Sequence, residues 1–86
     1  MSLRRGASDL YRTLLAESDD ELEIRIYRTR GRGRFWWEIT AAVPLGAHTT
    51  EYEREPLGVS DRFFCSPVDC TTDAQINAED IQGYLV

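Results

Sequence analysis

Three side chains in this sequence combine affinity for soft metals with nucleophilic or basic chemistry: Cys65, Cys70 and His48. A structural zinc site normally takes four Cys or His ligands in closely spaced pairs. Here four residues separate the two cysteines, and the histidine is distant in sequence. Neither a nucleophile elbow nor a glycine-rich oxyanion turn accompanies these residues. We therefore expect no metal site and no cofactor, and a thiol or hydrolytic enzyme built on Cys65 and His48 is the weakest functional alternative.

Carboxylates occur in groups, and paired carboxylates can perform acid–base catalysis when burial raises the pKa of one of them. All of the groups lie in polar stretches, which indicates solvated surface charge rather than a catalytic pair. On one face of a strand, alternate acidic residues would lie about 6.6–6.8 Å apart, close to the phosphate spacing of a nucleic-acid strand. The groups are Asp19/Asp20, Glu51/Glu53/Glu55 and Glu79/Asp80.

A third cluster combines arginines with aromatic residues around Gly31 and Gly33. Trp36 is expected on the face opposite to Trp37, near Tyr27. An exposed tryptophan beside arginines is typical of recognition surfaces and of platforms that stack on single-stranded bases. The alternative is a solvated turn in which Arg25 and Tyr27 cover Trp36. The arginines of the cluster are Arg28, Arg30, Arg32 and Arg34.

The elements that position this cluster form the clearest pattern in the chain. Residues 21–30 and 35–43 both alternate between apolar and polar side chains, which predicts two strands. Glycines at 31 and 33 supply the positive φ that tight hairpin turns need, and a loop with an even number of residues places both apolar sets on one face. We predict a β-hairpin whose buried residues are Ile24, Ile26, Trp37 and Ile39.

Apolar residues before the hairpin recur with a helical period. Leu3, Ala7, Leu10 and Leu14 follow spacings of four, three and four residues, which predicts a helix over residues 4–17 that ends near Ser18-Asp19-Asp20. A helix with one apolar face must pack against another element. We expect it to lie across the apolar face of the hairpin.

The pattern after the hairpin is weaker. Residues 47–55 alternate between two polar faces, which predicts a partly exposed strand at a sheet edge, where charges block unwanted pairing. Residues 59–65 predict a fourth strand, and residues 66–69 a turn. A short helix is expected from about Asn77 to Gly83, followed by a tail. The sequence thus predicts an α+β domain: an N-terminal helix packed on a small antiparallel sheet of three to four strands, with a short C-terminal helix or tail.

Length and composition restrict the functional classes. Eighty-six residues predict a single domain over 1–86. No apolar run approaches the roughly 20 residues of a membrane span, and no secretory signal is evident, so we expect a cytoplasmic location without membrane contact and with reduced thiols. All ten bases are arginine; residues 1–34 carry a balance of +2 and residues 35–86 a balance of −7. This overall acidity disfavours general nucleic-acid binding and permits an acidic surface aimed at a basic partner.

These observations favour a small non-enzymatic module that binds a protein partner through the Arg/Trp hairpin, the acidic surface, or both. An inhibitor of the mobile-element (phage anti-defence) type would have these properties, because carboxylates can occupy the sites where an enzyme expects phosphates. Direct nucleic-acid binding through the arginine-rich turn is the main alternative. Either a monomer or a homodimer is compatible with a small sheet that has open edges. The partner-binding candidates are Tyr27, Arg28, Arg30, Arg32, Arg34, Trp36, Glu51, Glu53 and Glu55.

Overall fold

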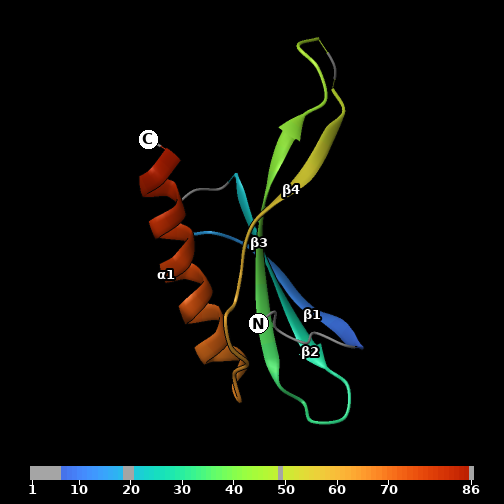
Figure 1. The fold of residues 1–86 in the computed structure, drawn as a ribbon, viewed down its shortest axis with the longest axis vertical. Coiled ribbons are helices and arrows are strands. Elements are labelled where there is room, and N and C mark those ends of the chain that lie inside the picture. The colour runs from blue at the N-terminus through green and yellow to red at the C-terminus, as the bar shows by residue number, and fades with distance from the viewer. Residues whose placement is uncertain (1–6, 19–20, 49, 86) are drawn as a thin grey trace.

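A computed structural model of the chain describes residues 7–18, 21–48 and 50–85. Four strands form one antiparallel sheet in the order β1-β2-β3-β4, and one helix, α1, lies along it (Figure 1). The architecture is therefore α+β, with the helix at the C-terminal end of the chain. The elements are β1 (Ser8–Leu15), β2 (Leu22–Thr29), β3 (Phe35–Pro44), β4 (Tyr52–Val59) and α1 (Pro67–Leu85).

The central hairpin of β2 and β3 confirms the prediction from alternation. Ile24 pairs with Ile39 and Ile26 pairs with Trp37, so the two apolar sets share one face. All four side chains are buried. Both glycines of the turn have positive φ, 91° at Gly31 and 63° at Gly33, as the tight turn requires.

The predicted N-terminal helix is wrong, because the described part of that segment forms β1. It pairs antiparallel with β2, Leu14 opposite Ile24, with a bulge between Leu10 and Arg12. A strand here satisfies the backbone groups on the outer edge of β2, a gain in hydrogen bonding that local periodicity does not report. Residues 4–6 of the predicted helix, and its predicted end at Asp19-Asp20, lie outside the described residues.

The edge strand after the hairpin exists, but its bounds differ from those predicted. β4 begins at Tyr52 and contains Pro56, which has no backbone N–H to donate and is therefore tolerated in sheets at edge strands and bulges. An irregularity in pairing between Ile39 and Thr40 leaves Leu57 as an extra residue in β4. The predicted fourth strand over residues 59–65 is wrong: Val59 ends β4, and the rest of that segment has an isolated bridge between Phe35 and Phe64.

The C-terminal helix is longer than predicted and begins ten residues earlier, at Pro67. Ser66 caps it, since its Oγ accepts the backbone N–H of Val68 at 3.2 Å. Proline at the first helical position and Asp69 in the first turn complete a helix start that the sequence interpretation assigned to a turn.

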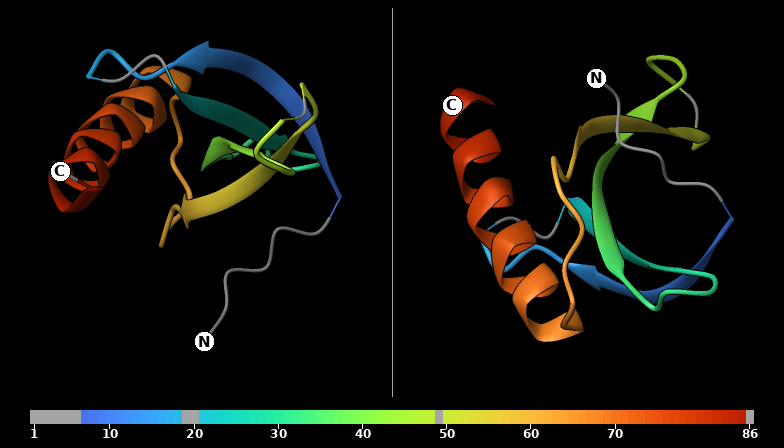
Figure 2. Two further views of the ribbon diagram at one scale, coloured as in Figure 1. Left: turned by 90° about the horizontal axis from the view of Figure 1, so that it is seen from above. Right: turned by 60° about the horizontal axis from the view of Figure 1, so that its bottom comes forward.

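The core lies between the sheet and α1 (Figure 2). From the helix, small residues spaced four apart enter it: Cys70, Ala74 and Ala78, each with no exposed surface. Their small volume lets the helix approach the isoleucines and Trp37 of the hairpin closely. Among the described residues, no helix combines the length and apolar character that a bilayer crossing requires.

The molecule is elongated, with principal extents of 45 × 25 × 25 Å. Its length comes from β3 and β4, which continue past the last residue of β3 that pairs with β2, Ala41. We call this projecting ribbon, residues 42–48 and 50–55, the arm. The arm and the β2–β3 turn, which we call the tip (residues 28–34), lie at opposite ends of the long axis (Figure 1).

Candidate functional site

Trp36 and Trp37 are adjacent on β3, so their side chains lie on opposite faces of the sheet. The indole N–H of Trp37 donates to Asp73 of α1 at 2.8 Å. The indole N–H of Trp36 donates to the Ser8 hydroxyl of β1 at 3.1 Å, and its ring stacks on Tyr27 at 4.3 Å between centroids. Trp36 therefore spans β2 and reaches β1.

This arrangement buries Trp36, which is only 6 % exposed. The expectation of an exposed tryptophan is wrong. Of the two residues in the alternative, Arg25 and Tyr27, the structure shows Tyr27 stacked on the ring. The cause is the additional strand β1, which extends the sheet beyond β2 and supplies a partner for the indole N–H. In this arrangement Trp36 offers no platform for a base, and Tyr27 is half-buried against it.

The arginines of the tip differ in their surroundings. Arg30 forms a two-pronged interaction with Asp9 of β1, with Nη2–Oδ1 at 2.8 Å and Nε–Oδ2 at 3.1 Å. These hydrogen bonds lower the pKa of Asp9 and raise that of Arg30. Arg32 and Arg34 are exposed and have no ion pair within the described part of the chain.

A network of charged side chains holds the base of the arm to the sheet. Arg54 of β4 donates to the Thr40 hydroxyl at 2.9 Å and to the Thr40 carbonyl at 3.1 Å. It also lies 3.6 Å from a Glu23 carboxylate oxygen, and Arg25 binds the other oxygen at 2.7 Å. Arg54 thus turns inward, toward the body, and joins three strands.

The acidic residues of the arm remain at its surface. Glu53 pairs with Val43 and Glu55 with Ala41, so both lie on the face of the ribbon that continues from the core. Glu51 immediately precedes β4, and its carbonyl accepts the N–H of Leu45. The three glutamates, predicted on one face of a strand, are all exposed; Glu53 and Glu55 share a face of β4, and Glu51 lies just outside the strand.

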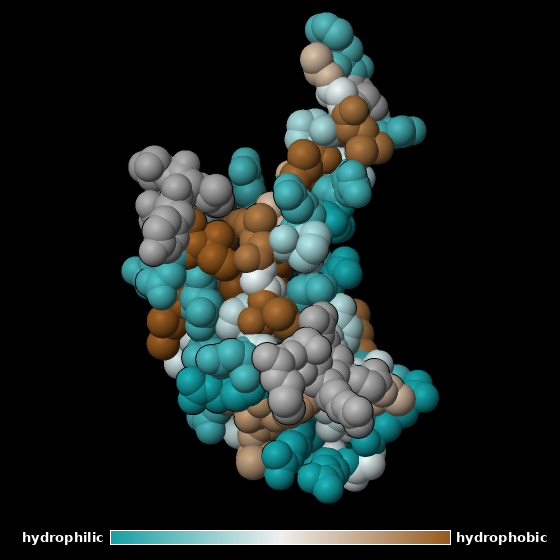
Figure 3. Space-filling model, in the orientation of Figure 1, coloured by the Kyte–Doolittle hydropathy of each residue, from teal (hydrophilic) through white to brown (hydrophobic). Residues whose placement is uncertain are grey.

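Apolar side chains accompany these carboxylates. Val43, Leu45 and Tyr52 are 37 %, 58 % and 62 % exposed. Tyr52 pairs with Pro44 and lies on the opposite face from Val43. Figure 3 shows apolar surface on the arm and between its base and α1, set among hydrophilic groups. Sequence alternation placed Glu53 and Glu55 on one face of a strand, but it did not show that this ribbon leaves the body of the protein.

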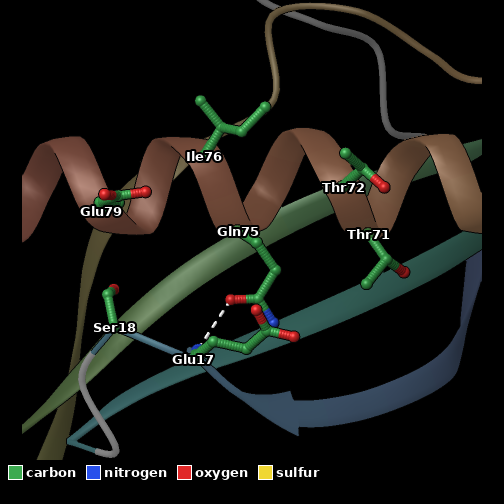
Figure 4. A pocket seen from close by; sticks show the side chains of 7 residues that line it. All are labelled: Glu17, Ser18, Thr71, Thr72, Gln75, Ile76 and Glu79. Carbon is green, nitrogen blue, oxygen red and sulfur yellow. Dashed lines mark hydrogen bonds between the residues drawn. The ribbon is translucent and has the colours of Figure 1, made fainter.

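A surface groove runs between α1 and the segment that follows β1, with a volume of about 350 Å³ (Figure 4). Gln75 crosses it: its side-chain oxygen accepts the N–H of Glu17 at 2.8 Å, and its nitrogen donates to the Leu15 carbonyl at 3.4 Å. The amide thereby pairs with backbone groups at the end of β1. Glu17 and Glu79 are the titratable residues in its lining.

The two thiols and the histidine lie in different surroundings. Cys70 is buried in the core, where burial and the nearby Asp73 carboxylate raise the pKa of its thiol to about 12. Cys65 is exposed, and His48 lies on the arm. Among the described residues, no group of three or more His, Cys, Asp or Glu side chains could hold a metal ion.

Comparison with known proteins gives no match to a family model, to a curated protein or to a solved structure.

Proposed function

We propose that this chain is a small non-enzymatic protein-binding module that docks through its arm onto a basic surface of a partner protein. The observation that carries the proposal is a two-stranded ribbon outside the body that combines exposed glutamates with exposed apolar side chains. Glu53 and Val43 share one face of it, and Tyr52 lies on the other.

Stability arguments support a binding role for the arm. A two-stranded hairpin is only marginally stable in water without a third strand or a helix to pack against. Residues 42–44 of β3 pair with β4 and not with β2, and their apolar neighbours remain exposed. The ribbon contributes little to the core, so contact with a partner accounts for its length and for its apolar side chains better than folding does.

The charge of the arm indicates the chemistry of the partner. Glu51, Glu53 and Glu55 are all exposed, while the cation of this strand, Arg54, is turned toward Thr40 and Glu23. An acidic surface with apolar side chains complements a basic surface with apolar pockets. Proteins that handle nucleic acids carry such surfaces, and we propose that the module regulates or inhibits one of them by occupying its phosphate-binding groups.

Site-specific photocrosslinking tests the proposal. A photoreactive phenylalanine analogue placed at Tyr52 should crosslink one major partner in extract of the source cells, and mass spectrometry then identifies it. The same analogue at Val68, which is 69 % exposed on α1, is the positional control. We expect the crosslink at position 52 and not at position 68.

Charge-matched variants then test the role of the glutamates with the purified partner. The triple variant Glu51→Gln, Glu53→Gln, Glu55→Gln should weaken affinity at least tenfold, about 1.4 kcal/mol. The control triple Glu21→Gln, Asp61→Asn, Asp69→Asn removes the same charge from exposed positions outside the arm. Equal affinities for the two triples, measured by calorimetry, would show that the arm does not recognise the partner through its charge.

A further inference from the structure

The tip carries an arginine at every second position from Arg28 to Arg34, far from the arm. We propose that the tip is a second binding surface, which contacts the phosphate groups of a nucleic-acid backbone without reading its sequence. This function is separate from docking through the arm and does not require it.

The backbone of the tip is fixed by its own hydrogen bonds. The Thr29 N–H donates to the Arg34 carbonyl at 2.8 Å, and the Arg34 N–H donates to the Thr29 hydroxyl at 3.1 Å. Between them, Gly31 and Gly33 adopt positive φ. The arginine side chains therefore project from a defined turn, which lowers the entropy cost of binding several phosphates at once.

The arginines divide into one that positions the tip and three that are available. Asp9 holds Arg30 and thereby ties the start of β1 to the turn. The guanidinium of Arg28 lies against the turn: its Nη2 is 3.3 Å from the point where a Cβ on Gly33 would be. With Arg32 and Arg34, it surrounds the turn with cations that no described carboxylate pairs.

The net charge of −5 does not oppose this contact. Charges separated by more than the Debye length, about 8 Å at physiological ionic strength, are largely screened from each other. The tip and the arm lie at opposite ends of an axis 45 Å long (Figure 1). The glutamates of the arm are therefore screened from a phosphate at the tip, where Arg28, Arg32 and Arg34 are the available cations.

The burial of Trp36 determines what the tip can recognise. Stacking on single-stranded bases needs an exposed aromatic ring, and Trp36 is 6 % exposed beneath Tyr27. Guanidinium groups bind phosphates in a two-pronged geometry that lysine does not offer. The tip thus has the chemistry for backbone contacts, which predicts weak affinity, little sequence preference and strong salt dependence.

Fluorescence anisotropy with a labelled 20-base-pair DNA duplex tests this proposal on the full chain. We expect binding at 50 mM salt that weakens linearly in a plot of log K against log salt concentration. The variant Arg32→Gln, Arg34→Gln should lower the magnitude of this slope by about 2, because each phosphate contact contributes about 0.9. The control Arg12→Gln, Arg62→Gln removes two exposed arginines elsewhere and should leave the slope unchanged.

Three results would overturn the proposal: no binding at 50 mM salt, the same slope in both double variants, or displacement of the duplex by polyglutamate at equal charge concentration. The third result would assign the tip to an acidic protein. The triple glutamine variant of the arm should bind the duplex as well as the unmodified chain or more tightly. Failure at the tip leaves the crosslink at position 52 intact, so the two proposals fail separately.

Discussion

The two thiols of this chain occupy opposite environments, although only four residues separate them. Cys70 faces the hairpin from the first turns of α1 and has no exposed surface, whereas Cys65 precedes the helix and is exposed. Burial disfavours a thiolate, and the Asp73 carboxylate adds repulsion, so the pKa of Cys70 rises to about 12. A thiol in this state packs as a small apolar residue and is a poor nucleophile at neutral pH.

The raised pKa of Cys70 predicts a loss of stability at alkaline pH. Above about pH 9 the thiol ionises in the unfolded chain but stays protonated in the folded one, so unfolding releases a proton. The free energy of unfolding should therefore fall by about 1.4 kcal/mol per pH unit between pH 9 and 12. Urea denaturation at several pH values measures this slope.

Two alanine variants isolate the contribution of Cys70 to that slope. Cys70→Ala should remove this contribution to the pH dependence of the free energy of unfolding, and Cys65→Ala should keep it. The slopes are compared, rather than the free energies themselves, because Cys70→Ala also changes the packing of the core at every pH. The absence of lysine simplifies the experiment, since no lysine side chain titrates in this range. Equal slopes in the two variants would contradict the burial argument.

At the scale of elements, the sequence predicted what local patterns determine. The hairpin of β2 and β3 was predictable because the alternation of apolar residues, the two glycines and the even number of loop residues all indicate the same structure. β1 was mispredicted as a helix because Leu10 and Leu14 fit a helical period, while the pairing with β2 that decides the outcome is a contact between distant segments. The start of α1 was missed although Ser66, Pro67 and Asp69 form a recognisable helix N-terminus.

The candidate sites were predictable only in part. Charge and alternation identified the arginines of the tip and the glutamates of the arm. They did not reveal that Arg30 is tied to Asp9, because that contact depends on β1. The sequence pattern also did not decide whether Trp36 is exposed. Trp36 lies on the face of the sheet away from α1, and a side chain on that face is buried only where the side chains of neighbouring strands cover it.

Trp36 joins three strands, and this predicts a stability role in place of a binding role. Trp36→Ala should cost about 3–5 kcal/mol, the usual range for a buried tryptophan. Trp36→Phe keeps a ring against Tyr27 and loses the hydrogen bond to Ser8, so it should cost less, about 1–2 kcal/mol. Chemical denaturation followed by circular dichroism measures both losses; a cost below 0.5 kcal/mol for the alanine variant would show that the ring does not hold β1.

At the scale of the whole molecule, the two proposed surfaces share a body but no side chains. The core between the sheet and α1 separates the tip from the arm, and their charges are screened over most of the 45 Å axis. A chain with this form could hold a basic protein at one end and a phosphate backbone at the other. Such a bridge is suited to a nucleoprotein target, in which both chemistries occur side by side.

The separation predicts that variants at the two ends act independently. The triple glutamine variant of the arm and the double glutamine variant of the tip should change the binding free energy additively, because distant sites without shared contacts are independent. We expect a coupling energy below about 0.5 kcal/mol, both for the protein partner and for the DNA duplex. Calorimetry and anisotropy on the four chains of a double-mutant cycle measure this coupling, and circular dichroism checks that each chain is folded. A coupling above 1 kcal/mol would mean that one ligand contacts both ends, or that the arm changes position when the tip is occupied. Either outcome would replace two surfaces with one, since screening forbids a direct electrostatic interaction of that size between charges so far apart.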